Sequence, residues 1–383
     1  MKGLLYILLS APLLSYTQEN VDYETFLLQR IEALQIKKDS FYYKGMFPTF
    51  RTNGGNTNVV KEDNTIFFTA LIAFTLQQCK NDFTSTQRVI CDSIIERTKR
   101  AYSYFQNLNG KPTYNFWPNN PPTIFPNNWF LNLFNRSQAL PDDVDDTVII
   151  NLIQNTSDSI LNILHQLMVK HANATDRITK SIYKDYRYIP TYSTWFGNKM
   201  PIEIDFSVLS NALYFIYDKK IRLVKQDSAT ITLLSLIIKN NKHITDAAYI
   251  SPQYARTPIL LYHIARLMDR FNIAILDSLK PRLIKDCFDA LGSSNNIMDS
   301  ILLETSLMRL NALFKPTKIP DSFSEIEKSR FIFFIGTFTS MFSNPFKRIF
   351  MSSPMLKYYY SCPAYNLALL LENMVERRRT KIY

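Results

Sequence analysis

The feature of this sequence that most limits its fold is a succession of about eleven segments with helical periodicity. In each segment apolar residues recur every three or four positions, as they do on the buried face of a helix. The connections are mostly short, and short connections favour antiparallel neighbours, so we expect a series of helical hairpins. The expected helices cover residues 23–36, 66–76, 84–105, 147–155, 156–167, 206–217, 231–238, 256–268, 279–291, 297–313 and 363–375.

Several of these helices begin directly after a polar or acidic cluster. The clusters are Glu62-Asp63, Asp142 to Asp146, Glu203 to Asp205 and Asp246 to Arg256. If the hairpins close into a ring, these helix starts meet at one mouth of a central cavity. We therefore predict an all-α protein, an α/α toroid that forms a single domain over residues 18–383. The aromatic, β-prone segment from Phe331 to Phe338 is expected to add a small β-hairpin near the C-terminus.

The first seventeen residues have the layout of a secretory signal peptide. Lys2 gives a short basic head, an apolar run from Gly3 to Leu14 follows, and the exit at Ser15 is small and polar. The run of about 12 residues is too short to span a bilayer comfortably. We predict that residues 1–17 are removed on export to the periplasm or the medium, leaving no transmembrane segment. A buried N-terminal helix is the alternative.

Composition excludes several classes of function. Glycine is scarce, with 8 residues in 383, and Gly54-Gly55 stands alone, so neither a P-loop nor a dinucleotide-binding fingerprint is present. The formal net charge is +11, but the basic residues are scattered and match no reader motif, so we expect no nucleic-acid partner. No Cys/His spacing resembles a zinc site, and we expect neither a metal nor a cofactor. Cys79 and Cys91 either form a disulfide between neighbouring helices or remain buried thiols.

The densest chemical feature is an acidic turn that holds Asp142, Asp143, Asp145 and Asp146 directly before an apolar helical run. Asp142 or Asp143 can cap this helix, and the helix dipole favours carboxylates in its first turn. Four carboxylates are more than a cap requires. If the turn faces a partly dry cavity, mutual repulsion raises the pKa of at least one carboxyl and keeps it protonated near neutral pH. Such a group can act as a general acid.

The residues Asp143-Val144-Asp145-Asp146-Thr147 resemble the Asp-x-Asp-Asp-Thr motif of squalene–hopene cyclases and other class II terpene cyclases. In that family an aspartic acid protonates an alkene or an epoxide inside an α/α toroid. The resemblance covers the motif and the helix behind it. It implies that Asp145 is the proton donor and that Asp143 and Asp146 tune its acidity.

A long irregular segment, residues 108–142, leads into the acidic turn and is rich in proline and aromatic residues. A disordered linker would lack the rings, so we interpret this segment as a packed loop beside the turn. Trp117, Trp129 and Phe130 line a cavity for an apolar chain, stack on sugar faces or close the mouth of the fold. The further candidates for ligand binding, which a ring would bring to the same mouth, are Asp63, Asp142, Asp205 and Arg256.

Two classes of function are compatible with these features. An exported general-acid enzyme would use Asp145 either to protonate a prenyl-type chain in a dry aromatic cavity or to cleave a glycan between two carboxylates. The alternative is a non-catalytic protein whose cavity binds a glycan, a lipid or a protein. The pKa of the aspartate cluster distinguishes them, because unperturbed carboxylates favour binding alone.

Overall fold

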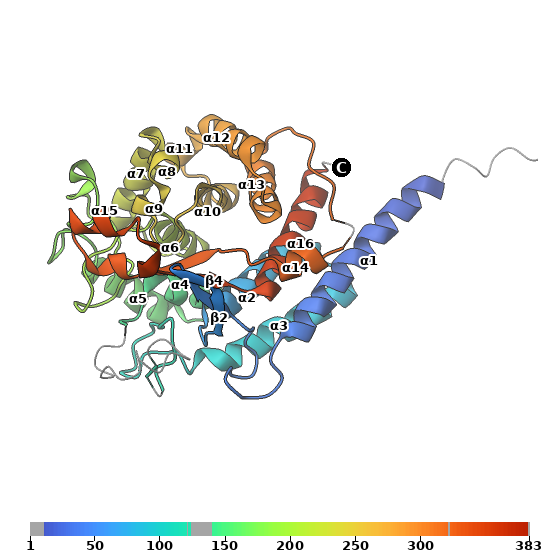
Figure 1. Cartoon of the computed structure of the whole chain (residues 1–383), viewed down its shortest axis with the longest axis horizontal. Helices are drawn as coiled ribbons and strands as arrows, with labels where there is room; N and C mark the ends of the chain where they lie inside the picture. The colour runs from blue at the N-terminus through green and yellow to red at the C-terminus, as the bar shows by residue number, and fades with distance from the viewer. Residues whose placement is uncertain (1–10, 121, 124–139, 321, 382–383) are drawn as a thin grey trace, which may run out of the picture.

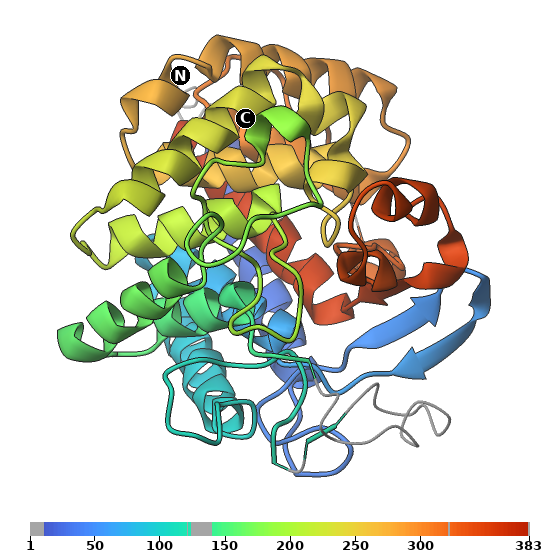
Figure 2. The ribbon, with the colours of Figure 1, turned by 90° about the vertical axis from the view of Figure 1, so that its left-hand side faces the viewer.

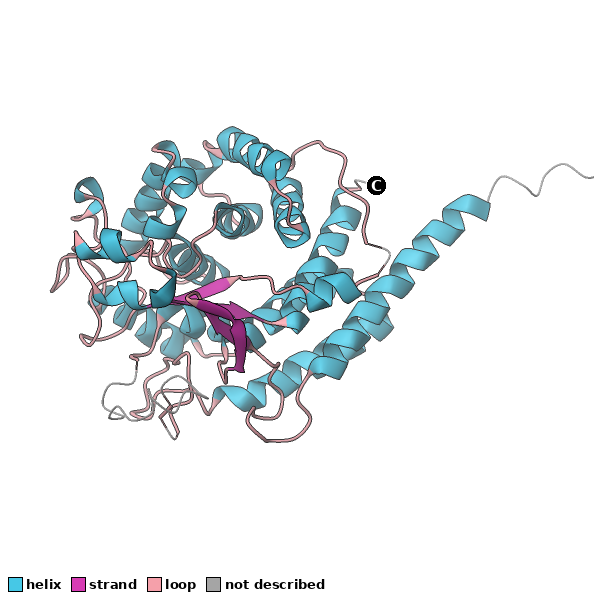
Figure 3. Ribbon diagram, in the orientation of Figure 1, coloured by secondary structure: helices cyan, strands magenta, loops and turns pink. Residues whose placement is uncertain are grey.

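The computed structural model describes residues 11–120, 122–123, 140–320 and 322–381, without the side chains of residues 11–22. In this part of the chain sixteen α-helices make up most of the structure, and a four-stranded antiparallel sheet accompanies them (Figure 3). The prediction of a mostly helical protein is therefore confirmed. The sheet is larger than the single hairpin that we expected.

Six helices, each buried on almost every side, contact one another in a closed sequence. α2 packs against α4, α4 against α6, α6 against α10, α10 against α13, α13 against α16, and α16 again against α2. Figure 1 shows their labels in this order around the middle of the molecule. Because a helix that is apolar on all sides needs cover on all sides, these helices form the centre of the core. Their bounds are α2 (Phe67–Cys79), α4 (Val144–Ile153), α6 (Phe206–Asp218), α10 (Thr257–Arg270), α13 (Ile297–Arg309) and α16 (Pro363–Thr380).

Four of the other long helices each bury one face against these six. α3 packs against α2, α7 against α6, α12 against α13, and α1 against α16. In α12 the buried residues Leu283, Asp286 and Cys287 recur at the three- and four-residue spacing of one helix face. The bounds are α1 (Ala11–Leu34), α3 (Ser85–Tyr102), α5 (Asp158–Lys170), α7 (Lys225–Lys239), α8 (Lys242–Thr245), α9 (Ala247–Ile250), α11 (Ala274–Asp277), α12 (Lys280–Ser293), α14 (Ser324–Lys328) and α15 (Phe346–Phe350).

The sheet joins two distant parts of the chain in the order β2-β1-β4-β3. β1 and β2 form a hairpin that the sequence analysis did not predict. Gly54 is required in its turn because a Cβ there would lie 2.4 Å from the carbonyl oxygen of Pro354. β3 lies within the predicted β-prone segment and pairs with β4. The bounds are β1 (Phe50–Asn53), β2 (Asn56–Glu62), β3 (Phe334–Thr337) and β4 (Lys357–Ser361).

The N-terminal segment and the cysteines bear on two further expectations. Of the predicted signal peptide, residues 1–10 lie outside the described residues and residues 11–17 lie in α1, so its removal stays a prediction. Within the described ranges, no helix combines the length and the apolar character needed to cross a bilayer. The four cysteines are buried and free, and the Cys91 thiol donates to the Leu76 carbonyl oxygen at 3.7 Å. For Cys79 and Cys91 the structure therefore favours the buried thiols.

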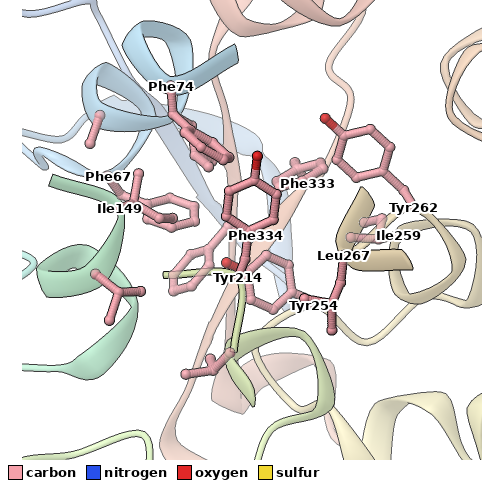
Figure 4. Close-up of a cluster of buried hydrophobic side chains, with 14 of the residues drawn as sticks. Phe67, Phe74, Ile149, Tyr214, Tyr254, Ile259, Tyr262, Leu267, Phe333 and Phe334 are labelled. Atoms are coloured by element: carbon pink, nitrogen blue, oxygen red, sulfur yellow. The ribbon is translucent and has the colours of Figure 1, made fainter. Parts of the chain in front are cut away.

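The core between the six central helices is rich in aromatic rings, and Figure 4 shows a cluster of them. Phe67, the first residue of α2, packs against Phe334 of β3 with ring centroids 4.7 Å apart. Tyr254, which precedes α10, lies within ring-contact distance of both. The sheet therefore covers the end of the core where helices α2, α4 and α10 begin.

Candidate functional site

The acidic turn lies in the wall of a pocket at this covered end. Asp143, Asp145 and Asp146 line it together with many aromatic side chains. The cavity volume is about 110 Å³, several times the about 10–15 Å³ that one water molecule needs. The rings that line the pocket are Phe67, Phe116, Trp117, Trp195, Phe334, Phe338, Tyr358 and Tyr360.

Two extended segments hold the acidic turn in position. The Asp143 N–H donates to the Tyr114 carbonyl oxygen at 3.1 Å, and the Val144 N–H donates to the Thr194 carbonyl oxygen at 2.8 Å. These bonds form isolated bridges on both sides of the turn. The segment on each side contributes one of the two tryptophan rings of the pocket, so the same bonds place the rings beside the carboxyl groups.

Asp143 is the N-cap of α4, as one of the two capping alternatives predicted. Its Oδ1 accepts a hydrogen bond from the Asp146 N–H at 2.8 Å. Asp142 instead accepts hydrogen bonds from the Asn107 amide and the Thr113 hydroxyl, both at 2.5 Å. Asp142 is not among the pocket-lining residues. Its contacts tie the acidic turn to the preceding loop.

Asp143 and Asp146 form a pair of buried carboxyl groups that are incompletely hydrogen-bonded. Oδ2 of Asp143 and Oδ1 of Asp146 have no hydrogen-bond partner among the described residues. Burial, with a smaller contribution from the charges of Asp145 and Asp142, raises the pKa of Asp143 to about 8. Burial and the charge of Asp143 raise the pKa of Asp146 well above its usual range. The pair therefore holds at least one proton at neutral pH.

Asp145 differs from this pair because hydrogen-bond donors surround it. The Asn211 amide donates to its Oδ1 at 2.6 Å, and the Tyr254 hydroxyl donates to its Oδ2. Burial raises the pKa of Asp145, while the two hydrogen bonds and the charge of Arg266 oppose that increase. Since these donors stabilise the carboxylate that remains after proton loss, Asp145 is a stronger acid than its two neighbours.

Arg266 of α10 fixes the orientation of the Asn211 amide. Its guanidinium donates to Asn211 Oδ1, so the amide nitrogen of Asn211 is the group that faces Asp145. The guanidinium is buried and lies 4.9 Å from the centroid of the Phe74 ring and 5.3 Å from that of Tyr262. A hydrogen-bond chain of fixed direction therefore runs from Arg266 through Asn211 to Asp145.

Buried carboxylates hold the two tryptophan rings of the pocket. The Trp117 indole N–H donates to Asp63 at 2.8 Å, and the Trp195 indole N–H donates to Glu203 at 2.9 Å. Asp63 is also ion-paired with Arg51, and both side chains are buried. Because each indole N–H already has an acceptor, the two tryptophans offer a ligand their ring surfaces and no hydrogen bond. Asp63, predicted to bind a ligand, instead orients Trp117.

Two further predicted binding residues, Asp205 and Arg256, do not line the pocket. Asp205 caps α6 with its Oδ1, and burial raises its pKa to about 7. Arg256 precedes α10 and is ion-paired with Asp299. Trp129 and Phe130 lie outside the described residues. The structure therefore brings Trp117 to the acidic turn and gives Asp205 and Arg256 contacts elsewhere.

Sequence reasoning did not select Asn211, Tyr254, Arg266 or Trp195. A signal was present for two of them, because Asn211 and Arg266 are polar residues inside otherwise apolar helical runs. A buried polar residue in such a run needs a hydrogen-bond partner, which is a reason to expect a polar site nearby. Tyr254 and Trp195 lie in loops and carried no comparable pattern.

Comparison with known proteins adds nothing to this geometry, since no family model, curated protein or solved structure matches the chain. The described residues also contain no group of three or more His, Cys, Asp or Glu side chains arranged to hold a metal ion.

Proposed function

We propose that the pocket is the active site of a general-acid enzyme that protonates a carbon–carbon double bond of an apolar chain, with Asp145 as the proton donor. The observation that carries this proposal is the meeting of three buried carboxyl groups, one with a pKa near 8, with eight aromatic rings in a single pocket. Acids with perturbed pKa values in an enclosed site are candidates for catalysis.

We also propose that the six central helices form the inner ring of an α/α toroid. Their closed sequence of contacts supports this arrangement, as does the packing of amphipathic helices such as α3, α7 and α12 against them. In such a ring the starts of α2, α4 and α10 lie at one end. The acidic turn is one of those starts, and the residues before α10 supply Tyr254.

Proton transfer follows from the hydrogen bonds of Asp145. Burial raises the pKa of Asp145 and so favours the protonated carboxyl group. In this form its hydroxyl gives a proton to one alkene carbon, a C–H bond forms, and the neighbouring carbon becomes a cation. The carboxylate that remains accepts the hydrogen bonds of Asn211 and Tyr254. The Asp143–Asp146 pair keeps at least one proton, so the two carboxyl groups beside the Asp145 carboxylate are not both negatively charged. Loss of a proton from the cation to water, or addition of water followed by loss of a proton, ends the reaction, and a proton taken up from water restores the Asp145 carboxyl group.

The pocket walls favour an apolar chain over a sugar. Aromatic faces stabilise a developing cation, and the two indole N–H groups, which would otherwise bind sugar hydroxyls, are occupied by Asp63 and Glu203. Glycan cleavage needs carboxyl groups on both sides of the bond. Asp143, Asp145 and Asp146 belong to one helical turn and approach a ligand from one side. The cavity of about 110 Å³ is suited to the reacting end of a chain.

The test is product analysis in D2O with a panel of linear isoprenoid alkenes and, in parallel, a panel of oligosaccharides. We expect an isomerised, cyclised or hydrated isoprenoid that carries one carbon-bound deuterium from the donor, detected by mass spectrometry. Shortened oligosaccharides would replace the proposal with glycan cleavage. Binding of either class without any product would favour the non-catalytic alternative.

A further inference from the structure

The connection between β3 and β4, residues 338–356, forms a cover over one side of the pocket. It contains α15 and two short 3-10 turns, Phe338–Met341 and Pro354–Leu356. Figure 2 shows this cover in dark red beside the blue β1–β2 hairpin. Phe338, Ser340 and Met341 of the cover line the pocket. The inner side of the cover is thus part of the site.

Polar contacts fix the cover to the neighbouring loop, residues 177–187. The buried Lys347 ammonium donates to the Ser181 carbonyl oxygen at 3.0 Å. The Asn344 N–H donates to the Lys180 carbonyl oxygen at 3.1 Å, and the Asn344 amide donates to the Tyr249 hydroxyl at 2.7 Å. Lys347 and Asn344 therefore face the body of the protein, and the opposite side of the cover is turned outward.

The outward face is apolar. Phe346 and Ile349 stand three residues apart on one face of α15, and their exposed fractions are 56% and 59%. Met341 and Met355, at the two ends of the cover, are 58% and 72% exposed. Four large apolar side chains exposed on one short segment, beside a pocket, are typical of an interaction surface rather than of an ordinary protein surface.

The charges around this face are cationic. Between Glu327 and Glu372 the sequence contains no acidic residue, and at the cover itself Arg348 is exposed and Lys357, directly after the cover, is half-buried. Arg348 is exposed on α15 itself, and its guanidinium lies 4.1 Å from the centroid of the Tyr249 ring. Lys180 is exposed on the adjoining loop, where Lys184 and Asp185 offset each other. Asp246, near that loop, is paired with Lys242 at 3.2 Å.

We propose that the outward face of the cover docks on an anionic lipid surface. Apolar side chains that enter the boundary between headgroups and acyl chains, with basic residues beside them, are the combination that such surfaces bind. Met341 lines the pocket and is also 58% exposed at one end of the cover, so docking of the cover brings the pocket next to the lipid. The proposal does not depend on the chemistry of Asp145, and its test requires no substrate.

The test is co-sedimentation of the full-length protein with vesicles of phosphatidylcholine alone and of phosphatidylcholine mixed with phosphatidylglycerol. We expect binding to the anionic vesicles that weakens with added salt, and much weaker binding to the neutral ones. The double variant Phe346→Ser/Ile349→Ser should lower the partition coefficient about tenfold or more, because each side chain loses its transfer into the apolar phase. The matched control is Val89→Ser/Leu313→Ser, which changes two exposed apolar residues outside the cover.

Circular dichroism and the thermal transition of both double variants should match those of the wild type, since all four side chains are largely exposed. Equal loss of binding in the two double variants, or binding that ignores lipid charge, would overturn the proposal. The proposal would also be overturned if the wild type self-associated, the Phe346→Ser/Ile349→Ser variant did not, and neither of the two bound vesicles. The occupant of the face would then be a second copy of the chain.

Discussion

Asp145→Asn should lower turnover at least about 100-fold while the protein stays folded, since general acids contribute about 10²–10⁴-fold to rate. Asn cannot supply the proton. It still fits the same hydrogen bonds, because its oxygen accepts from the Asn211 amide and its NH2 group donates to the Tyr254 hydroxyl once that hydroxyl turns. The measurement is the rate of product formation on the isoprenoid panel, with circular dichroism to confirm the fold.

The matched control is Asp142→Asn, which removes a carboxyl group from the same turn but outside the pocket lining. Asp142 accepts hydrogen bonds from Asn107 and Thr113, so its replacement affects the loop contact and should leave most of the turnover. Undiminished activity in Asp145→Asn would show that Asp145 is not the proton donor and would make the Asp143–Asp146 pair the next candidate. Equal losses in both variants would indicate a structural role for the whole turn.

Asp63→Ala should lower the free energy of unfolding by about 3–5 kcal/mol, the usual cost of breaking a buried ion pair by removing one partner. The change leaves the Arg51 guanidinium buried without this counter-ion and removes the acceptor of the Trp117 indole N–H. Denaturant unfolding measures the loss, and a disturbed Trp117 environment should appear in the fluorescence of the folded protein.

Asp289→Ala provides the comparison, because it breaks an ion pair with Lys285 in which both side chains are more than half exposed. An exposed pair of this spacing on a helix contributes about 0.3–0.5 kcal/mol. A cost for Asp63→Ala no larger than that for Asp289→Ala would contradict the assignment of Asp63 to a buried, structural ion pair.

Helix positions were largely predictable from the sequence because they depend on local periodicity. The apolar run expected over 66–76 is α2 at Phe67–Cys79, and the run expected over 206–217 is α6 at Phe206–Asp218. Helix α13 is shorter than expected, since the chain leaves the helix after Arg309 and Asn311 has a positive φ of 54°. The period of apolar residues decides where a helix lies, and backbone geometry at its end decides where it stops.

The sheet was largely missed for a physical reason. The residues of β2 are almost all exposed and show no alternation of buried and exposed positions, so the pattern that predicts a strand is absent. β1 pairs with β4, whose residues are about three hundred positions further along the chain, and such pairing depends on tertiary packing. Only β3 carried a local signal, through its aromatic, β-prone sequence.

The candidate site was half predictable. The acidic turn and the capping role of Asp143 follow from residues close together in sequence. The two hydrogen-bond donors to Asp145 are Asn211 of α6 and Tyr254 of the loop before α10. Only the fold brings these residues to Asp145. Asp63 and Asp205 occur at helix starts as expected, but their side chains are used in an ion pair and a helix cap.

Infrared difference spectroscopy tests the central claim, a carboxylic acid of the pocket that stays protonated at neutral pH. The C=O stretch of a protonated carboxyl group absorbs above the amide I band, and subtracting the spectrum of Asp143→Asn/Asp146→Asn from that of the wild type removes the contribution of Asp63 and Asp205. We predict a protonated carboxyl band at pH 7 that weakens as the pH rises through about 8, because burial raises the pKa of Asp143 to that value, and that persists in part at higher pH, because burial and the charge of Asp143 raise the pKa of Asp146 well above its usual range. A difference spectrum that shows only carboxylate at pH 7 would contradict the account and favour a pocket that binds its ligand without chemistry.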